Sequence, residues 1–405
     1  MTTRPASRFL DRSTAPNITT LILMAGLAAL SLNVFLPSLP SMALSFGVPY
    51  GVMQLSVSLY LAATAVLQVF IGPVSDRFGR RPVALGATIV FTLVTIGAIA
   101  APTFGVFLAC RLLQAIIATG FVLSRAVVRD MVPQDQAASM IGYVTMGMSI
   151  VPMIGPVIGG VLDQAFGWQA SFVMLAVGGI GLLALVWADM GETAVSRSPS
   201  FAAQFRQYPQ LLKSQRFWGY CLASAFASGA FFAYLGGAPF VGTDVFALDP
   251  ARLGFYFGAP ALGYLVGNFI SGRYSTRYGV NRMVMAGAVV TTAGLVVLAA
   301  LAVAGIMSPL VFFGLVIAVG LGNGILLPNT NAGMLSVRPA LAGSAAGLGG
   351  AFTIGGGAAL SALAGVVLRP GSGPLPLVLV MLVSSAVSIL CILWVIRRER
   401  QLGIA

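Results

Sequence analysis

Charged residues are scarce in this chain of 405 residues: only 8% are Asp, Glu, Lys or Arg, and 58% are hydrophobic. A soluble globular domain carries about 25% charged residues, because water must solvate its surface. With a mean hydropathy of +0.96, the composition excludes a soluble protein and leaves no room for a sizeable soluble domain. Most of the chain is expected to lie in a lipid bilayer.

Histidine is absent, and the three cysteines, Cys110, Cys221 and Cys391, lie far apart in apolar runs. Such spacing forms neither a disulfide framework nor a zinc-ligand pattern. Without histidine the chain also lacks the commonest metal ligand. We therefore expect no metal and no cofactor. An enzyme is not expected either, because no apolar run carries a nucleophile–base pair or paired carboxylates.

Long apolar runs are what the sequence does contain. A transmembrane helix needs about 20 mostly apolar residues. The first run is too long for a signal peptide and follows a charged segment, so we count it as a span. The runs predict an all-α integral membrane protein with twelve transmembrane helices, at 18–40, 52–73, 82–101, 104–128, 138–162, 168–188, 216–240, 252–272, 281–304, 309–334, 341–367 and 374–396.

Basic residues predict the orientation of these spans. The formal net charge is +12, with 21 arginines and one lysine. If the N-terminus is cytoplasmic, eighteen of these residues fall in inside segments, whereas only Arg252 and Arg369 fall outside. Cytoplasmic loops carry such an excess of Lys and Arg, so the charge reflects topology and not nucleic-acid binding. We expect a multi-pass protein of the cell inner membrane with both termini cytoplasmic.

The spans divide into two sets of six. Residues 191–215 form the longest polar loop, and a short motif recurs with an offset of 200 residues: Gly72, Ser75, Arg77 and Gly79 match Gly272, Ser275, Arg277 and Gly279. Duplicated halves related by an axis along the membrane normal are a transporter architecture. The predicted domains are pseudo-symmetric: an N-terminal six-helix half at 1–190, a cytoplasmic linker at 191–215 and a C-terminal six-helix half at 216–405.

The first copy of the repeat carries the first functional motif, which reads Gly72-x-x-x-Asp76-Arg77-x-Gly79-Arg80-Arg81. Glycines permit a tight turn and close helix approach, and a carboxylate accepts bonds from a helix N-terminus or an arginine. We predict a tight charged turn at the inner face, with Arg129 and Asp130, which end span four, within reach of it. The alternative is an ordinary basic inner loop that serves topology alone.

A second motif lies in span five and consists of Gly147, Gly155, Pro156, Gly159 and Gly160. Proline removes one hydrogen bond from a helix, and glycines permit a bend or a tight helix contact. We assign these residues to gating. The alternative is glycine-rich packing without a directional role.

The third motif is Arg111 with Gln114 in span four. An arginine deep in a span costs about 2.5–3.5 kcal/mol and normally faces a cavity or a partner. Arg111, Gln114 and Arg125 lie along one stripe of the helix. We predict substrate contact, and the alternative is a structural arginine bonded to backbone carbonyls.

Together these motifs resemble the signatures of the major facilitator superfamily. The chain is most similar to its drug–proton antiporters of bicyclomycin, chloramphenicol and florfenicol resistance, through Leu36-Pro37-Ser-Leu-Pro40 ending span one and Ser124-Arg125-Ala-Val-Val-Arg129-Asp130 ending span four. The resemblance implies two six-helix halves and export, not import. It also implies a gate at the inner face, which Asp76 closes by engaging the start of span eleven. It also links Arg111 to coupling and substrate contact.

One position departs from that group: three residues before Leu36-Pro37, where an aspartate is common, this chain has Asn33. No carboxylate falls near the bilayer midplane, since seven acids are placed inside (Asp11, Asp76, Asp130, Asp135, Asp189, Glu192 and Glu399) and three outside (Asp163, Asp244 and Asp249). The usual intramembrane proton carrier is therefore missing. Coupling runs through edge groups such as Asp76 or Asp130, or transport is not proton-coupled in the usual way.

The substrate pocket is expected between the halves, near the midplane. The predicted lining combines polar and aromatic side chains: Asn33, Phe35, Arg111, Gln114, Phe231, Phe232, Tyr234, Tyr256 and Asn323. A pocket with a buried arginine and no carboxylate favours neutral, amphipathic or anionic compounds over lipophilic cations.

These observations predict a secondary active exporter of small drug-like or antibiotic-like compounds. We expect a monomer in the lipid bilayer, with a small-molecule substrate, protons as the coupling ion and no nucleic-acid partner. Two alternatives stay open. One is a dedicated exporter of a metabolite or siderophore, and the other is a transporter-like receptor that moves no solute.

Overall fold

A computed structural model of the chain describes residues 8–131, 140, 144, 151, 154–194, 208–338 and 342–403, and the regular elements in this part are all helices. The N-terminal helices are α1 (Ile18–Asn33), α2 (Leu39–Phe46), α3 (Tyr50–Met53), α4 (Leu55–Phe78), α5 (Arg80–Ile99), α6 (Phe104–Gln114), α7 (Thr119–Met131) and α9 (Gln169–Asp189). The others are α11 (Tyr208–Leu212), α12 (Gln215–Phe240), α13 (Pro250–Phe257), α14 (Ala259–Tyr278), α15 (Val280–Val303), α16 (Pro309–Val337), α17 (Ala342–Val367) and α18 (Leu375–Gln401).

Eleven helical segments of the described chain are long and apolar enough to cross a membrane, and a shorter apolar helix covers Ile154–Phe166. They occupy the twelve expected positions, which confirms the all-α twelve-span prediction. Most of span five, at 138–162, lies outside the described residues. Three predicted ends were too early, because α4, α14 and α18 continue to Phe78, Tyr278 and Gln401.

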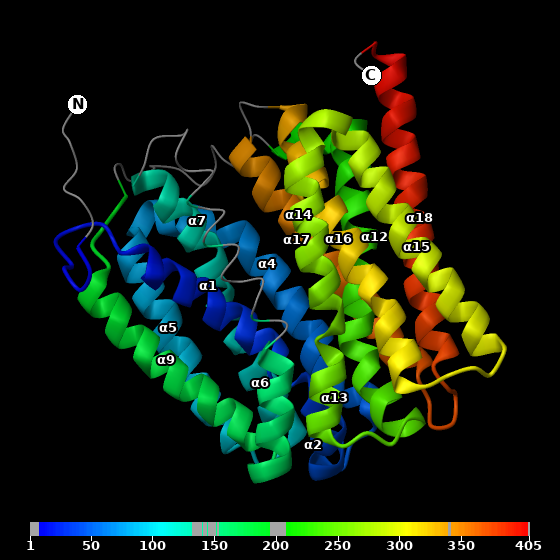
Figure 1. Cartoon of the computed structure of the whole chain (residues 1–405). Helices are drawn as coiled ribbons and strands as arrows, with labels where there is room; N and C mark the ends of the chain where they lie inside the picture. The colour runs from blue at the N-terminus through cyan, green and yellow to red at the C-terminus, as the bar shows by residue number, and fades with distance from the viewer. Residues whose placement is uncertain are drawn as a thin grey trace.

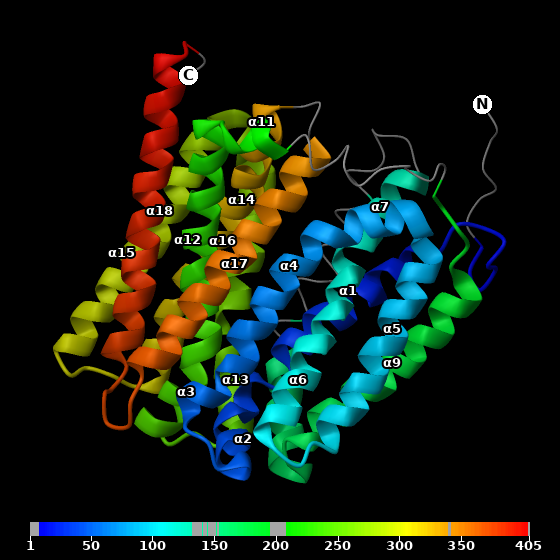
Figure 2. The same cartoon turned by 180° about the vertical axis from the view of Figure 1, so that it is seen from behind.

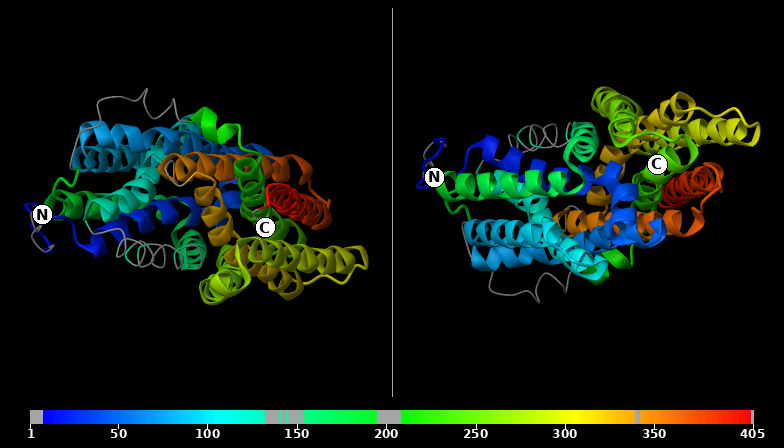
Figure 3. Two further views of the ribbon diagram at one scale, coloured as in Figure 1. Left: turned by 90° about the horizontal axis from the view of Figure 1, so that it is seen from above. Right: turned by 90° about the horizontal axis from the view of Figure 1, so that it is seen from below.

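The helices form two bundles that stand side by side, one from α1 to α9 and the other from α12 to α18 (Figures 1 and 2). Seen from above or below, the two bundles give the molecule an elongated outline (Figure 3). Residues 8–17 and the end of α18 lie at the same end of the molecule (Figure 1). We call this the basic end, because the arginine-containing α4–α5 and α14–α15 turns also lie there. The domain boundaries near 190 and 215 remain predictions.

The repeated motif builds the same turn in each half. Gly79 and Gly279 have φ angles of +100° and +82°, which glycine adopts without steric cost. Each glycine N–H bonds back to the serine four residues earlier, with N···O distances of 3.0 Å from Gly79 to Ser75 and 2.9 Å from Gly279 to Ser275. The repeat therefore reflects a shared backbone requirement for ending one helix and starting the next.

Span one is not the single helix that was expected. α1 ends at Asn33, and a short 3-10 turn at Leu36–Ser38 leads into α2. Pro37 and Pro40 cause this break, because neither can donate the backbone hydrogen bond that continues a helix. The Leu30 carbonyl still accepts from the Val34 N–H at 2.9 Å, and the carbonyls after it are left without helical partners.

The two halves meet closely at the end opposite the basic end, which we call the far end. The Tyr50 hydroxyl donates to the Gly236 carbonyl at 2.6 Å. The Gln54 side-chain amide donates to the Ser361 carbonyl at 2.6 Å. One cluster of buried apolar side chains includes residues of both halves, whereas a second belongs to the C-terminal half alone. This far-end contact holds the halves together in the structure.

Glycines of the span-five motif take part in this contact. A Cβ at Gly160 would overlap the carbonyl of Pro250 in the other half, and one at Gly254 would overlap the carbonyl of Pro156. A Cβ at Gly159 would overlap the Val34 carbonyl just after α1. Backbone therefore lies directly against backbone at these positions, and only glycine fits.

We expect Gly160→Ala to lower thermal stability and loosen the far-end contact. Overpacking typically costs about 1–3 kcal/mol, which exceeds the roughly 1 kcal/mol gained by alanine in a helix. Gly181→Ala in α9 is the matched control, because a Cβ there meets open space. Thermal unfolding of both purified variants tests this. A Gly160→Ala protein as stable as Gly181→Ala would contradict the contact.

Candidate functional site

Arg111 of α6 is completely buried, with 0% of its surface exposed. Its guanidinium lies between two aromatic rings, with Cζ 4.3 Å from the centroid of Phe35 and 3.9 Å from that of Tyr60. Phe35 follows α1 and Tyr60 belongs to α4, so three elements meet here. The negative faces of the rings stabilise the cation by a cation–π interaction.

Neutral groups provide the hydrogen bonds of Arg111. Nη2 donates to the Ser31 carbonyl at 2.8 Å, and Nη1 donates to Gln114 Oε1 at 2.9 Å. The Gln114 amide in turn donates to Thr95 Oγ1 at 2.7 Å. Ser31 lies in the last turn of α1, and the helix ends before the Phe35 N–H can bond to the Ser31 carbonyl. The guanidinium thus satisfies a carbonyl that the broken helix leaves open.

No carboxylate neutralises this charge among the described residues. The ion pairs of the described residues include Arg80–Asp76, Arg80–Asp130, Arg216–Glu399 and Arg252–Asp249, and none of these involves Arg111. Arg111 Nε is buried and has no hydrogen-bond partner in the described part of the chain. A buried cation with an open donor can receive a hydrogen-bond acceptor or an anion.

The structure thus gathers Phe35, Arg111 and Gln114, as expected, and adds Ser31, Tyr60 and Thr95. We call these six residues the Arg111 cluster. Asn33 lies near it in the chain but is 3% exposed, and its side chain donates to the Ala29 carbonyl at 2.7 Å. Sequence reasoning missed Ser31, Tyr60 and Thr95, because their types are common in spans and only the packing of α1, α4 and α5 brings them together.

The predicted residues of the C-terminal half lie on three other helices. Tyr234 of α12 is fully buried, its hydroxyl donates to the Phe257 carbonyl at 2.8 Å, and its ring stacks on Phe257 at 5.0 Å. Tyr256 of α13 stacks on Phe313 at 5.5 Å and lines a far-end pocket of about 570 Å³. In this conformation both tyrosines contribute to packing.

Phe231, Phe232 and Asn323 differ from these tyrosines. Phe231 and Phe232 are partly exposed, and Phe232 lies against Gly357 of α17. Asn323 of α16 is buried, and its Oδ1 has no partner among the described residues. Substrate contact by the C-terminal residues remains a prediction.

The predicted gate centres on Arg80, which is 8% exposed. Its guanidinium contacts Asp76 at 2.6 Å and Asp130 at 3.0 Å, and it also bonds to Ser75 Oγ. One arginine therefore joins the α4–α5 turn to the end of α7. The structure brings Asp76, Arg80 and Asp130 together, as the sequence predicted.

A third carboxylate holds this turn, and sequence reasoning did not assign it a role. The two oxygens of Glu192 accept the backbone N–H groups of Arg80 at 2.8 Å and Arg81 at 3.3 Å. These are the first residues of α5, where a negative charge is favoured by the helix dipole. A Cβ at Gly79 would collide with Glu192. The available signal was an acid placed just after span six.

The remaining residues of the predicted gate make fewer contacts with the described residues. Arg77 stacks on Phe78 at 5.7 Å, and Arg81 Nη2 donates to the Trp187 carbonyl at 3.1 Å. A Cβ at Gly72 would meet no described atom within 4 Å, so a close helix approach at this glycine stays a prediction. Two motif residues cannot be placed in this way: Gly147 and the side chain of Arg129 lie outside the described residues. Contact between Asp76 and the start of span eleven stays a prediction, because 339–341 are also outside.

Two further buried acids hold the basic end. Asp189 accepts bonds from the backbone of Leu10 at 2.7 Å and Asn17 at 2.8 Å, which ties residues 10–17 to the end of α9. Glu399 pairs with Arg216 at 2.6 Å and accepts from Asn281 at 2.5 Å. Glu399 thus holds the α14–α15 side of its half, as Glu192 holds the α4–α5 turn.

Comparison with known proteins agrees with this architecture. Residues 21–258 match the Major Facilitator Superfamily. The chain is 32% identical over 258 residues to the uncharacterized MFS-type transporter YdgK of Bacillus subtilis, covering 62% of this chain and 64% of that protein, slightly less than two thirds. It is 32% identical over 303 residues to a chloramphenicol resistance protein of Pseudomonas aeruginosa, covering 73% of this chain and 71% of that one.

Longer alignments and solved structures give the same result. The chain is 27% identical over 371 residues to a bicyclomycin resistance protein homolog of Haemophilus influenzae, covering 90% and 92% of the two chains. A crystal structure of a bacterial homolog of the human lysosomal transporter Spinster, inward-facing and occupied, superposes with a TM-score of 0.70 at 14% identity, covering 95% and 96%. That likeness shows the fold.

Loss of the Glu192 carboxylate should destabilise the basic end of the N-terminal half. We expect Glu192→Ala to cost about 0.5–2 kcal/mol, the usual effect of removing a helix N-terminal acceptor. Asp11→Ala is the control, since the Asp11 side chain bonds only to Ser13 among the described residues. Unfolding of the purified proteins measures the difference, and equal stability of the two variants would show that Glu192 does not hold the turn.

Proposed function

The chain belongs to the Major Facilitator Superfamily, and from this premise we propose that it is a secondary active transporter that exports small amphipathic compounds by alternating access. The substrates are drug-like or antibiotic-like molecules. Relatives named for chloramphenicol and bicyclomycin resistance support this class. The protein is a multi-pass membrane protein and a transporter, not an enzyme.

The observation that carries this proposal is the environment of Arg111. Its charge is buried between Phe35 and Tyr60, and its hydrogen bonds go to Ser31 and Gln114. Since no carboxylate of the described chain pairs with it, an acceptor group on a ligand can complete its bonding. Neutral molecules with carbonyl groups and carboxylate-bearing molecules fit this chemistry, whereas lipophilic cations do not.

The charge and the contacts at the two ends of the bundle support an orientation in the membrane and a gate on each side. We place the basic end in the cytoplasm, on the excess of arginines there, with both termini cytoplasmic and the protein in the inner membrane as a monomer. The far-end contact closes the outer side, and the cluster of Arg80, Asp76 and Asp130 serves as the inner gate. Protons are the proposed coupling ion, through these edge carboxylates, since Asn33 replaces a midplane acid.

Transport by purified protein in proteoliposomes tests the role of Arg111. We expect Arg111→Lys to lower transport of a neutral phenicol about 10–100-fold, because hydrogen bonds to a charged group are worth about 1.5–3 kcal/mol. Lysine keeps the charge but loses the planar donor fork. Arg111→Ala should abolish transport.

The control is Arg369→Ala, an exposed arginine at the far end. It should transport like the wild type. Gel filtration and thermal unfolding identify variants that are merely misfolded. Normal transport by folded Arg111→Lys and Arg111→Ala proteins would show that the arginine is structural and that the substrate binds elsewhere.

A further inference from the structure

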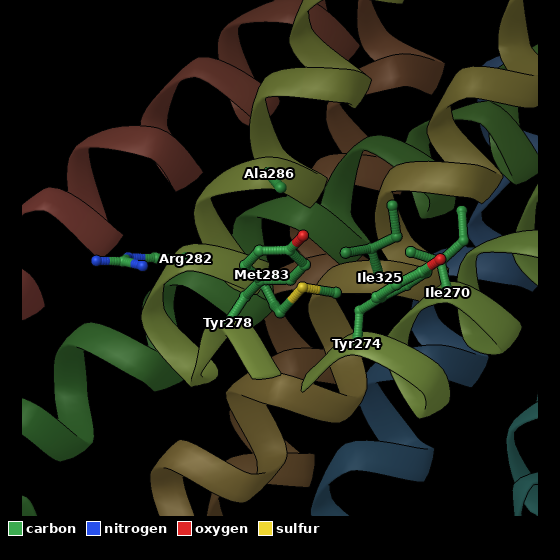
Figure 4. Close-up of a pocket in the computed structure, with 7 residues that line it drawn as sticks. All are labelled: Ile270, Tyr274, Tyr278, Arg282, Met283, Ala286 and Ile325. Carbon is green, nitrogen blue, oxygen red and sulfur yellow. The ribbon is translucent and has the colours of Figure 1, made fainter. Parts of the chain in front are cut away.

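A groove runs between α14 and α15 at the basic end of the C-terminal half (Figure 4). α14 and α15 each pack closely on α16 but touch each other little, which leaves this gap between them. Its volume is about 470 Å³, and it is lined by Ile270, Tyr274 and Tyr278 of α14, Arg282, Met283 and Ala286 of α15, and Ile325 of α16. The lining is therefore apolar and aromatic, with one arginine.

Arg282 belongs to the lining of this groove, and the Arg277 guanidinium lies over the ring of the lining Tyr278, with Cζ 5.6 Å from its centroid. Arg273 and Arg277 lie in the last turns of α14, Arg282 lies in the first turn of α15, and all three are exposed. Between Asp249 and Glu399 the sequence has no Asp or Glu. None of these arginines belongs to an ion pair with another described residue.

The corresponding turn of the N-terminal half has an ion pair whose residue types do not recur in the C-terminal turn. Asp76 and Arg80 pair with each other in the N-terminal turn. The equivalent positions, 200 residues later, are Thr276 and Val280, while Arg277 is retained. The second copy therefore has neither member of that ion pair, and Arg277 remains exposed at its turn.

We propose that this groove binds an anionic phospholipid from the leaflet at the basic end. Its phosphate lies at the rim with Arg277 and Arg282, and an acyl chain follows the apolar side chains toward Ala286 and Ile325. Figure 4 shows Arg282 reaching outward from the side chains that line the groove, while Tyr274 and Tyr278 lie over its length.

General features of membrane proteins agree with this occupant. Basic pockets between transmembrane helices on the cytoplasmic side recognise anionic headgroups. Long arginine side chains extend toward the membrane surface while their stems remain on apolar groups. A soluble anion would need only the rim, whereas a lipid uses both the charged rim and the apolar groove.

Native mass spectrometry of the purified protein tests the proposal. The wild type is titrated with phosphatidylglycerol and with phosphatidylethanolamine of the same acyl chains, and we expect phosphatidylglycerol to bind more tightly. The double variant Arg277→Gln/Arg282→Gln should lose about 30-fold in affinity for phosphatidylglycerol, at roughly five-fold per basic residue.

The control is Arg8→Gln/Arg12→Gln, which removes two exposed arginines from the same end of the other half. It should leave the affinity unchanged. Equal losses in both double variants would show that only overall charge matters and would overturn the site.

Two further arms separate a lipid from a soluble anion. Ala286→Phe fills the exposed apolar part of the groove and keeps every charge, so it should weaken phosphatidylglycerol binding. Excess inorganic phosphate should not displace the lipid. Full displacement by phosphate, or normal lipid binding by Ala286→Phe, would contradict a lipid site.

Discussion

The buried charge of Arg111 is the constraint on which the centre of this molecule depends. A charge at this depth costs several kcal/mol unless neighbouring groups stabilise it. Here the stabilising groups are the rings of Phe35 and Tyr60 and the Ser31 carbonyl. That carbonyl is available because Pro37 and Pro40 end α1 early. The end of α1, the arginine and the aromatic pair therefore form one set of contacts, in which no described carboxylate takes part.

The two halves share a backbone plan but differ in charge. Gly79 and Gly279 form the same turn, yet the N-terminal turn is held by Asp76, Asp130 and Glu192, whereas the acid that bonds beside the C-terminal turn is Glu399, through Asn281. The N-terminal turn thus has a paired set of ions, and Arg277 and Arg282 beside the C-terminal turn are exposed. This asymmetry underlies our proposals of an inner gate in the N-terminal half and a lipid site in the C-terminal half.

Much of the fold could be predicted from the sequence, because spans are set by hydropathy and the turns by a visible repeat. The break after Asn33 was missed, since hydropathy stays high through 18–40 and does not indicate where the backbone changes direction. The Glu192 contact could not be predicted either, because the acid lies 112 positions from Arg80 and only the packing of α9 on α5 joins them. In the candidate site, Arg111 and Gln114 could be predicted because arginine and glutamine are rare inside transmembrane helices. Tyr60 and Thr95 were not, because such residues are ordinary there.

A binding series in ligand charge tests the central claim, that a buried cation without an acidic partner determines what this transporter accepts. Purified protein is titrated by calorimetry with three aromatic compounds of matched size: one neutral, one with a carboxylate and one with a quaternary ammonium group. The account predicts that the carboxylate and neutral compounds bind and that the ammonium compound binds most weakly, since like charges repel in a low-dielectric site. Tightest binding of the ammonium compound would contradict it.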